Sequence, residues 1–192
     1  MLLGEEISIY EGINSVYSLK QEDLIFLTNY FTKIELPKQT KLIIKGEICD
    51  KLYFLSKGCC RSFYALDNKN VTLWLGHEGD FLTSFKSWML NEPSHETIEL
   101  CENGTLYYIT YTDMMFLCKE NHAINIFYRH LIEAGLIYWE NRSTMLLFKS
   151  AKERLQNLID RYPMVMQRWQ LSHIASYLGI TQETLSRLRS ER

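Results

Sequence analysis

The chain has 192 residues, of which 46% are hydrophobic and 23% are charged. This composition matches ordinary globular domains and excludes a chain that is disordered over most of its length. The longest apolar run has five residues, Met114 to Cys118, whereas a helix that crosses a bilayer needs about 18. The N-terminus has no basic segment followed by an apolar one, so we expect no signal peptide, no membrane partner and a cytoplasmic protein.

The charges are unevenly distributed along the chain, although the net charge is only −2. Residues 150–192 carry seven Lys/Arg against four Asp/Glu, whereas residues 1–149 carry fourteen against nineteen. A basic C-terminal part on an acidic body indicates two regions with different partners.

The cysteines argue against a disulfide framework and against a metal site. There are five, an odd number, and no two of them are separated by two residues. Cys59 and Cys60 are neighbours, so on a strand they face opposite sides of the sheet. We therefore expect free thiols in a reducing compartment, with no metal and no cofactor.

The first two thirds of the chain show the pattern of a β-domain. A helix is expected over residues 20–32, followed by a β-rich region from Ile34 to Lys119 that short turns divide. The polar segments 67–70 and 102–104 each separate two β-rich runs, so both predict hairpins. Many short strands separated by turn residues indicate a sandwich or a barrel.

A long helix is expected next, because residues 121–149 contain no proline and no strand alternation. Apolar residues recur there in a heptad pattern, which predicts the seam of a parallel two-stranded dimer. A long amphipathic helix that packs on its own core is the alternative. Arg129 and Glu133 lie beside the seam at the spacing of a helical ion pair. The predicted seam consists of Ile124, Phe127, Leu131, Ala134, Tyr138, Asn141, Met145 and Phe148.

The segment from Leu171 to Ser190 meets the requirements of a helix-turn-helix. Ala175 is small enough for a close helix crossing, Gly179 tolerates a left-handed turn, and Thr181 can cap the second helix. An ordinary pair of helices with a solvated polar face is the alternative. The outer face of the second helix carries residue types that contact base edges or phosphates: Gln182, Glu183, Ser186, Arg187 and Arg189.

Residues 174–187, Ile-Ala-Ser-Tyr-Leu-Gly-Ile-Thr-Gln-Glu-Thr-Leu-Ser-Arg, closely resemble the DNA-binding motif of the Crp/Fnr family of bacterial transcription regulators. Residues 46–58 resemble the early strands of that family's cyclic-nucleotide-binding-like jelly roll. Residues 78–82 resemble the start of its effector-binding cassette, and the long helix resembles its dimerisation helix.

This resemblance implies specific partners and roles. It implies a homodimer that binds a near-palindromic operator in double-stranded DNA and contacts RNA polymerase. Gln182, Glu183 and Arg187 fall at the family's base-reading positions, and Thr181 is a candidate for a phosphate contact. The link from Pro163 to Gln170 is too short for a full β-hairpin wing, so we expect a reduced wing.

The effector cassette departs from the pattern of members that bind cyclic AMP. Those members carry Gly-Glu where this chain has Thr83-Ser84, and an Arg-Ser or Arg-Ala pair near the position of Ser94-His95-Glu96. No Arg or Lys lies between Lys86 and Lys119, and a buried phosphate without a cation is costly. We therefore expect a pocket that does not bind cyclic AMP. Its candidate residues are Gly79, Asp80, Phe81, Thr83, Ser84, Ser94 and Thr97.

The sequence thus predicts an α+β transcription regulator with three parts. These are a β jelly-roll effector domain over residues 1–119, a dimerisation helix over 120–149, and a helix-turn-helix DNA-binding domain over 150–192. An effector-binding module that has lost DNA binding is one alternative. A cupin-like metal enzyme is the other, but such enzymes use a His-x-His pair, which this chain lacks. We expect no catalytic residues.

Overall fold

The computed structural model describes residues 6–66 and 69–190. Two helices, α1 (Ile9–Val16) and α2 (Gln21–Thr28), precede the strands. The β-region contains β1 (Thr32–Leu36), β2 (Lys41–Ile43), β3 (Lys51–Lys57), β4 (Cys60–Leu66), β5 (Lys69–Gly76), β6 (Phe81–Leu82), α3 (Phe85–Leu90), β7 (Thr97–Leu100), β8 (Gly104–Thr110) and α4 (Tyr111–Glu120). The remainder is helical, with α5 (His122–Phe148), α6 (Ala151–Arg161), α7 (Val165–Arg168), α8 (Leu171–Leu178) and α9 (Gln182–Ser190).

The strands form two four-stranded antiparallel sheets. One sheet has the strand order β1-β8-β3-β6, and the other has the order β2-β7-β4-β5. Buried side chains of both sheets form one apolar cluster, with Leu55 and Leu106 from the first sheet and Ile98 and Leu100 from the second. Two packed antiparallel sheets are the sandwich that the sequence predicts.

The first predicted hairpin is confirmed. Strands β4 and β5 pair antiparallel, with Cys60 opposite Gly76 and Leu66 opposite Lys69. Lys69 and Asn70, which the sequence pattern assigns to the turn, belong to β5. The rest of that turn, residues 67–68, lies outside the described residues.

The second predicted hairpin is wrong. Strand β7 pairs with β2 and β4, whereas β8 pairs with β1 and β3. The segment 101–103 therefore carries the chain from one sheet to the other. A short polar segment with a glycine serves both kinds of connection, and strand pairing through distant partners decides between them.

Two helices interrupt the region that the sequence assigns to strands up to Lys119. Helix α3 lies between β6 and β7, and α4 follows β8 directly. The Thr110 hydroxyl caps α4 by accepting a hydrogen bond from the Asp113 amide at 3.1 Å. The apolar run Met114–Cys118 is thus part of a helix, because its buried members Met114 and Leu117 are spaced for a helix rather than a strand.

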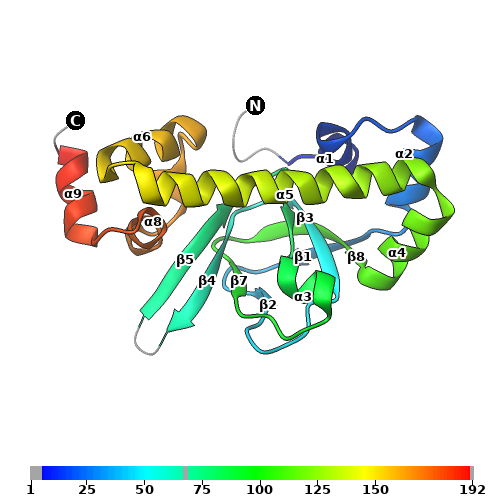
Figure 1. Ribbon diagram of the computed structural model, residues 1–192, viewed down its shortest axis with the longest axis horizontal. Coiled ribbons are helices and arrows are strands. Elements are labelled where there is room, and N and C mark those ends of the chain that lie inside the picture. The colour runs from blue at the N-terminus through cyan, green and yellow to red at the C-terminus, as the bar shows by residue number, and fades with distance from the viewer. Residues whose placement is uncertain (1–5, 67–68, 191–192) are drawn as a thin grey trace.

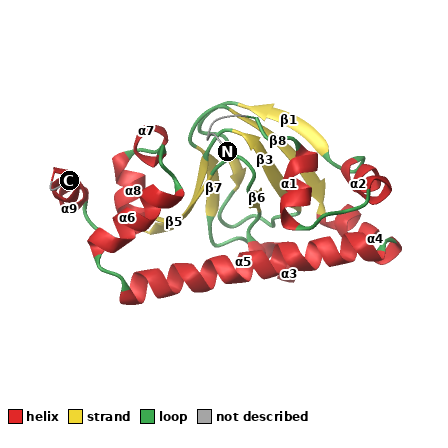
Figure 2. Ribbon diagram, turned by 90° about the horizontal axis from the view of Figure 1, so that it is seen from above, coloured by secondary structure: helices red, strands yellow, loops and turns green. Residues whose placement is uncertain are grey.

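Helix α5 is as long as predicted and runs along the length of the molecule (Figure 1). The β-structure lies on one side of it (Figure 2). Ile124, Phe127 and Leu131 are buried in the same apolar cluster as Phe54 and Trp88. The prediction that these three residues meet a second copy is wrong, since the chain's own core already covers them.

Beside that stripe, the predicted ion pair on α5 is confirmed. The Arg129 guanidinium Nε lies 3.4 Å from a Glu133 carboxylate oxygen, and both side chains are exposed. Such an exposed ion pair one helical turn apart adds only about 0.3–0.5 kcal/mol to the stability. None of the described helices is long and apolar enough to span a membrane.

Candidate DNA-binding interface and effector cavity

The helix-turn-helix forms as its sequence requires. Gly179 ends α8 in the left-handed conformation with φ of 66°. The Ile180 amide donates to the Ala175 carbonyl at 3.0 Å, which closes the turn. Thr181 caps α9, because its hydroxyl accepts a hydrogen bond from the Thr184 amide at 3.1 Å.

Helix α9 separates an apolar face from a polar face. Leu185 is fully buried and Leu188 packs against the same cluster, together with Ile174 and Leu178 of α8. The residues predicted to contact DNA are all exposed on the other side: Thr181, Gln182, Glu183, Ser186, Arg187 and Arg189. All six belong to α9 or its N-cap, and α9 lies at the opposite end of the molecule from α4 (Figure 1). Between residues 150 and 190 no strand is described, and the short helix α7 stands where a wing would be.

The Ser176 side chain fastens helix α8 to strand β5 of the β4–β5 hairpin. The Thr72 amide donates to the Ser176 hydroxyl at 2.8 Å, and that hydroxyl lies 3.2 Å from the Asn70 carbonyl oxygen, to which it donates. Arg142 of α5 joins the same contact. Its guanidinium donates to the carbonyl oxygens of Leu73 and Tyr177 and stacks on the Tyr177 ring at 3.9 Å. Two of the three guanidinium nitrogens thus donate to backbone carbonyls of two separate elements, while the third, Nη1, is buried without a hydrogen-bond partner.

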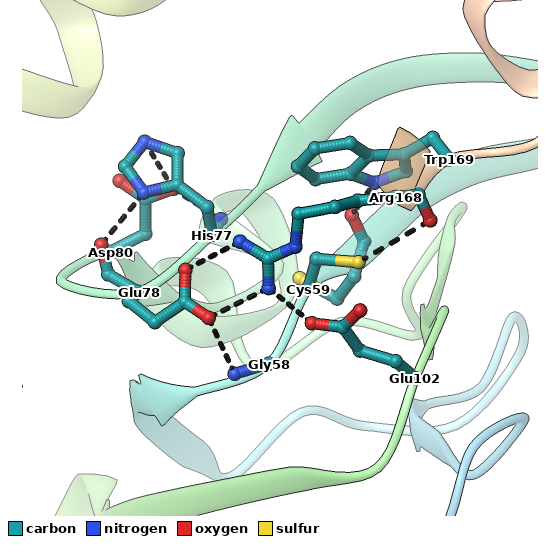
Figure 3. A network of polar contacts seen from close by, with 9 residues as sticks. Gly58, Cys59, His77, Glu78, Asp80, Glu102, Arg168 and Trp169 are labelled. Atoms are coloured by element: carbon teal, nitrogen blue, oxygen red, sulfur yellow. Dashed lines mark hydrogen bonds and ion pairs between the residues drawn. The ribbon is translucent and has the colours of Figure 1, made fainter. Parts of the chain in front are cut away.

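Arg168, at the end of α7, joins the helical region to the sandwich (Figure 3). Its guanidinium donates two hydrogen bonds of 2.7 Å to the Glu78 carboxylate and a further one to Glu102. The side chain of Glu78 is 2% exposed and that of Arg168 is 10% exposed. The next residue, Trp169, donates from its indole nitrogen to the Cys60 carbonyl at 2.9 Å.

The charge on Glu78 depends on Arg168. Burial alone would raise the pKa of this carboxyl, but hydrogen bonds from Arg168 and from the Gly58 amide hold the pKa below its ordinary value. Glu78 therefore stays ionised at neutral pH. The pair stabilises the folded chain above the ordinary pKa of a glutamate, and this stability is lost as the pH falls through the lowered value.

A cavity of about 230 Å³ lies between α5 and the sandwich. Four predicted effector residues line it, namely Gly79, Asp80, Phe81 and Thr83. Aromatic side chains from four parts of the chain supply half of the other lining residues. The complete lining comprises Val16, Trp74, Leu75, Gly79, Asp80, Phe81, Thr83, Phe85, Leu131, Ala134, Gly135, Tyr138, Trp139 and Tyr162.

Asp80 is the one acidic residue in the described lining of this cavity, and no lysine or arginine is among those residues. Its carboxylate accepts a hydrogen bond from the His77 amide at 2.9 Å. Burial raises the pKa of Asp80, and the neighbouring His77 and Arg161 oppose that rise. Arg161 stacks over the rings of Tyr138 and Tyr162, at 5.4 and 5.2 Å. The cavity is therefore an aromatic pocket with a carboxylate in its wall.

The other three effector candidates lie outside this cavity. Ser84 and Ser94 are buried and hydrogen bonded to each other at 3.0 Å. The Thr97 hydroxyl accepts a hydrogen bond from the Lys45 amide at 3.2 Å. Nearby, burial raises the pKa of the Glu96 carboxyl, which Ser62 contacts through its hydroxyl. The structure thus divides the predicted pocket between a cavity and a separate cluster of hydroxyl groups.

The residues in the second half of the predicted seam lie in different surroundings. Ala134 and Tyr138 line the cavity, and Met145 packs against the core of the helical region. Asn141 is exposed. Phe148, the last residue of the predicted seam, is exposed as well, together with large apolar residues outside the seam on α5, including Leu136, Ile137 and Leu147.

Comparisons with known proteins agree with this architecture. Residues 33–121 match the cyclic nucleotide-binding domain family. FixK2 from Bradyrhizobium japonicum has a similar structure, with a TM-score of 0.71 and 20% identity over 84% of this chain and 83% of that one. The Thermus thermophilus catabolite activator protein gives a TM-score of 0.59 and 18% identity, over 94% and 85% of the two chains. The c-di-GMP-responsive global regulator CLP of Xanthomonas campestris gives 0.70 and 14%, over 90% and 91%. No curated protein sequence matches the chain.

The chain has the Crp/Fnr fold. The resemblance first seen in the helix-turn-helix motif and in the strand order is confirmed at the level of the fold. A cyclic nucleotide-binding domain is followed by a long helix and by a set of C-terminal helices. The described residues contain no group of three His, Cys, Asp or Glu side chains placed to hold a metal ion, which a cupin site requires.

Three residues that fasten the Crp/Fnr fold together escape the sequence patterns. Arg142 lies 18 residues, or five helical turns, beyond Ile124. A cation in an otherwise apolar stripe is a signal that could have been noticed. Glu78 and Arg168 are 90 residues apart in the sequence, and nothing local indicates that they meet.

Replacing Arg168 with Met should destabilise the protein strongly at neutral pH. The substitution leaves Glu78 ionised, buried and without a cation, which costs about 3–5 kcal/mol. The difference in unfolding free energy between the wild type and the variant should shrink as the pH falls, because the buried Glu78 carboxyl then becomes protonated and no longer needs a cation. Urea unfolding of the wild type and of Arg168→Met at pH 7 and pH 4.5 measures both effects.

Glu102→Gln is the matched control, since Glu102 is the more exposed partner of Arg168, at 37%. Removing the charge of Glu102 should change the free energy of unfolding by less than about 1 kcal/mol. Equal stability of Arg168→Met and the wild type at pH 7 would contradict the inference that Arg168 stabilises the buried, ionised Glu78.

Proposed function

We propose that this protein is a dimeric, sequence-specific DNA-binding transcription regulator. The observation that carries the proposal is the polar face of α9, which is exposed along its length while Leu185 anchors the opposite face in the core. In a helix-turn-helix, the second helix enters the major groove with its outer face toward the base edges. The proposed domain boundaries are those of the sequence patterns, at residues 119/120 and 149/150.

The proposed roles on α9 follow from its side-chain chemistry. Arg187 can donate two hydrogen bonds to guanine, and Gln182 and Glu183 can bond to adenine and cytosine edges. Thr181, Ser186 and Arg189 are proposed to contact the DNA backbone, which positions the helix without reading sequence. We also propose, from the family resemblance, that the bound protein contacts RNA polymerase, and that it acts in the cytoplasm.

The proposed sensor does not recognise cyclic AMP. A cyclic phosphate in the cavity would meet the Asp80 carboxylate and would find no lysine or arginine in the described lining. Burying that phosphate without a cation, next to a like charge, is unfavourable. The aromatic wall favours a small molecule of low polarity as the effector.

The proposed dimer forms through the outward side of α5. Leu136 and Leu147 are 71% and 74% exposed, and Phe148 is 77% exposed. Residues eleven positions apart lie about three turns apart on nearly the same line of a helix, so Leu136 is aligned with Leu147 and Ile137 with Phe148. Four large apolar side chains along one solvent-facing stripe favour burial against the same stripe of a second copy.

Arg187→Ala should weaken binding to an operator by about 1–3 kcal/mol per half-site and relax the preference at one base pair. The operator is expected to be a near-palindrome with half-sites about 34 Å apart, and a randomised-site selection with the purified protein would supply it. Competition across operator variants at fixed salt concentration measures the effect.

Arg189→Ala is the matched control on the same helix. Its loss should weaken binding to all sequences alike and reduce the salt slope by about one unit. Equal losses on operator and random DNA for Arg187→Ala would show that Arg187 does not read bases. No loss for either variant would favour a module that has abandoned DNA binding.

Titration with cyclic AMP should release no heat in calorimetry at concentrations below millimolar. A cyclic-AMP-binding regulator of the same fold serves as the positive control. A micromolar Kd, about −8 kcal/mol, would overturn the proposal, because so much binding energy requires a cation partner for the phosphate.

Leu136→Asp should convert the dimer into a monomer that remains folded. The substitution would place two carboxylates in the proposed interface without cations. Leu66→Asp, at an exposed leucine on β4, is the matched control and should leave the mass in light scattering unchanged. A monomeric wild type at micromolar concentration would refute the interface.

A further inference from the structure

Two free cysteines face each other across the β4–β7 ladder. Cys60 pairs with Leu100 in this antiparallel ladder, so Cys59 and Cys101, one step further along, are directly opposite. The Cys101 amide donates to the Cys59 carbonyl at 2.7 Å, and the two thiols lie close enough for each to shift the pKa of the other. Opposite residues in such a pair have Cα atoms about 5.5 Å apart, near the middle of the range that disulfides span.

The two thiols differ in exposure and in acidity. Cys59 is fully buried, whereas Cys101 is half-buried. The contact with Cys59 lowers the pKa of Cys101 against the effect of burial, and His173 and Arg61 act in the same direction. The same contact, together with burial, raises the pKa of Cys59. The less buried member of the pair therefore carries the larger thiolate fraction, and the fully buried member the smaller one.

The remaining cysteines lack this arrangement. Cys49 and Cys60 are buried, and burial raises the pKa of Cys60 well above its ordinary value. Cys118 is half-buried like Cys101, but burial raises its pKa to about 11. At similar exposure, Cys101 and Cys118 thus differ mainly in their thiolate fraction.

We propose that Cys101 and Cys59 are a hydroperoxide-reactive pair that closes a cross-strand disulfide beneath the helix-turn-helix. The Cys101 thiolate attacks the terminal oxygen of the hydroperoxide and the O–O bond breaks, which gives a sulfenic acid at Cys101. Hydroxide leaves from hydrogen peroxide, or an alkoxide from an alkyl hydroperoxide, and takes a proton from solvent. The Cys59 sulfur then attacks the Cys101 sulfur, and the hydroxyl leaves as water with the Cys59 proton. The two thiols together lose two electrons, and the hydroperoxide is reduced to water or an alcohol.

The disulfide would act on the junction between the sandwich and the helical region. The Cys59 thiol donates to the Arg168 carbonyl at 3.8 Å and packs in the cluster of Trp169 and Ile174. Glu102, the neighbour of Cys101, is a partner of the Arg168 guanidinium. Oxidation removes the thiol proton and draws the Cys59 sulfur toward β7, so the contacts of α7 and α8 on this sheet loosen.

The test is oxidation of the full-length protein with hydrogen peroxide, followed by alkylation, trypsin digestion and mass spectrometry. Cys101 should react at least several-fold faster than Cys118, because its larger thiolate fraction outweighs its lower intrinsic nucleophilicity. The product should link the peptide Gly58–Arg61 to the peptide that contains Cys101. Each of the two peptides holds two cysteines, because the second, Ser87–Lys119, contains both Cys101 and Cys118. Cys60→Ser and Cys118→Ser should therefore keep the link, whereas Cys59→Ser and Cys101→Ser should abolish it. Fragment ions that separate Cys101 from Cys118 give the two oxidation rates.

In Cys59→Ser, the sulfenic acid at Cys101 should persist and react with dimedone. The proposed reactive pair would be contradicted if Cys101 oxidised no faster than Cys118, or if the sulfenic acid persisted in the wild type. Hydrogen exchange of α7 and α8 should rise on oxidation of the wild type and not of Cys59→Ser. Unchanged exchange in the oxidised wild type would overturn the link to the junction. Both readouts are independent of DNA binding.

Discussion

The contact between Arg168 and Glu78 determines where the helical region sits on the sandwich. Both side chains are removed from water, and ions in that position are stable only when their hydrogen-bonding capacity is met. A planar guanidinium that donates two parallel bonds to a carboxylate meets this condition with a defined orientation. Trp169 and α8 follow directly in sequence, so the direction of Arg168 also fixes the helix-turn-helix against β4 and β5.

Helix α5 links three environments, and its position couples them. Its N-terminal half is part of the core through Ile124 and Phe127. Its middle forms a wall of the cavity through Ala134 and Tyr138. Further along, Arg142 holds the carbonyl oxygens of α8 and β5. A helix is stiff over this length, so a change in the cavity wall would be transmitted to the contacts of Arg142.

The sheet face beneath the helix-turn-helix concentrates polar and reactive groups. Glu78, Glu102, Cys59 and Cys101 all lie close to Arg168 or to His173. Glu78 is also adjacent in sequence to Gly79 and Asp80 of the cavity. Ligand binding and thiol oxidation, if both occur in this chain, would therefore act on the same junction from two sides.

The sequence by itself determined the elements whose geometry depends on near neighbours. The β4–β5 hairpin and the turn at Gly179 with its cap at Thr181 follow from local steric and hydrogen-bonding rules. The tertiary structure decided everything that depends on distant partners. A heptad stripe defines one apolar side of α5, but the chain's own core, and not periodicity, decides what covers Ile124 and Leu131. Likewise, a polar turn cannot specify whether β7 and β8 pair, and no local pattern brings Arg168 to Glu78, because pairing across long sequence separations is selected by the packing of the whole fold.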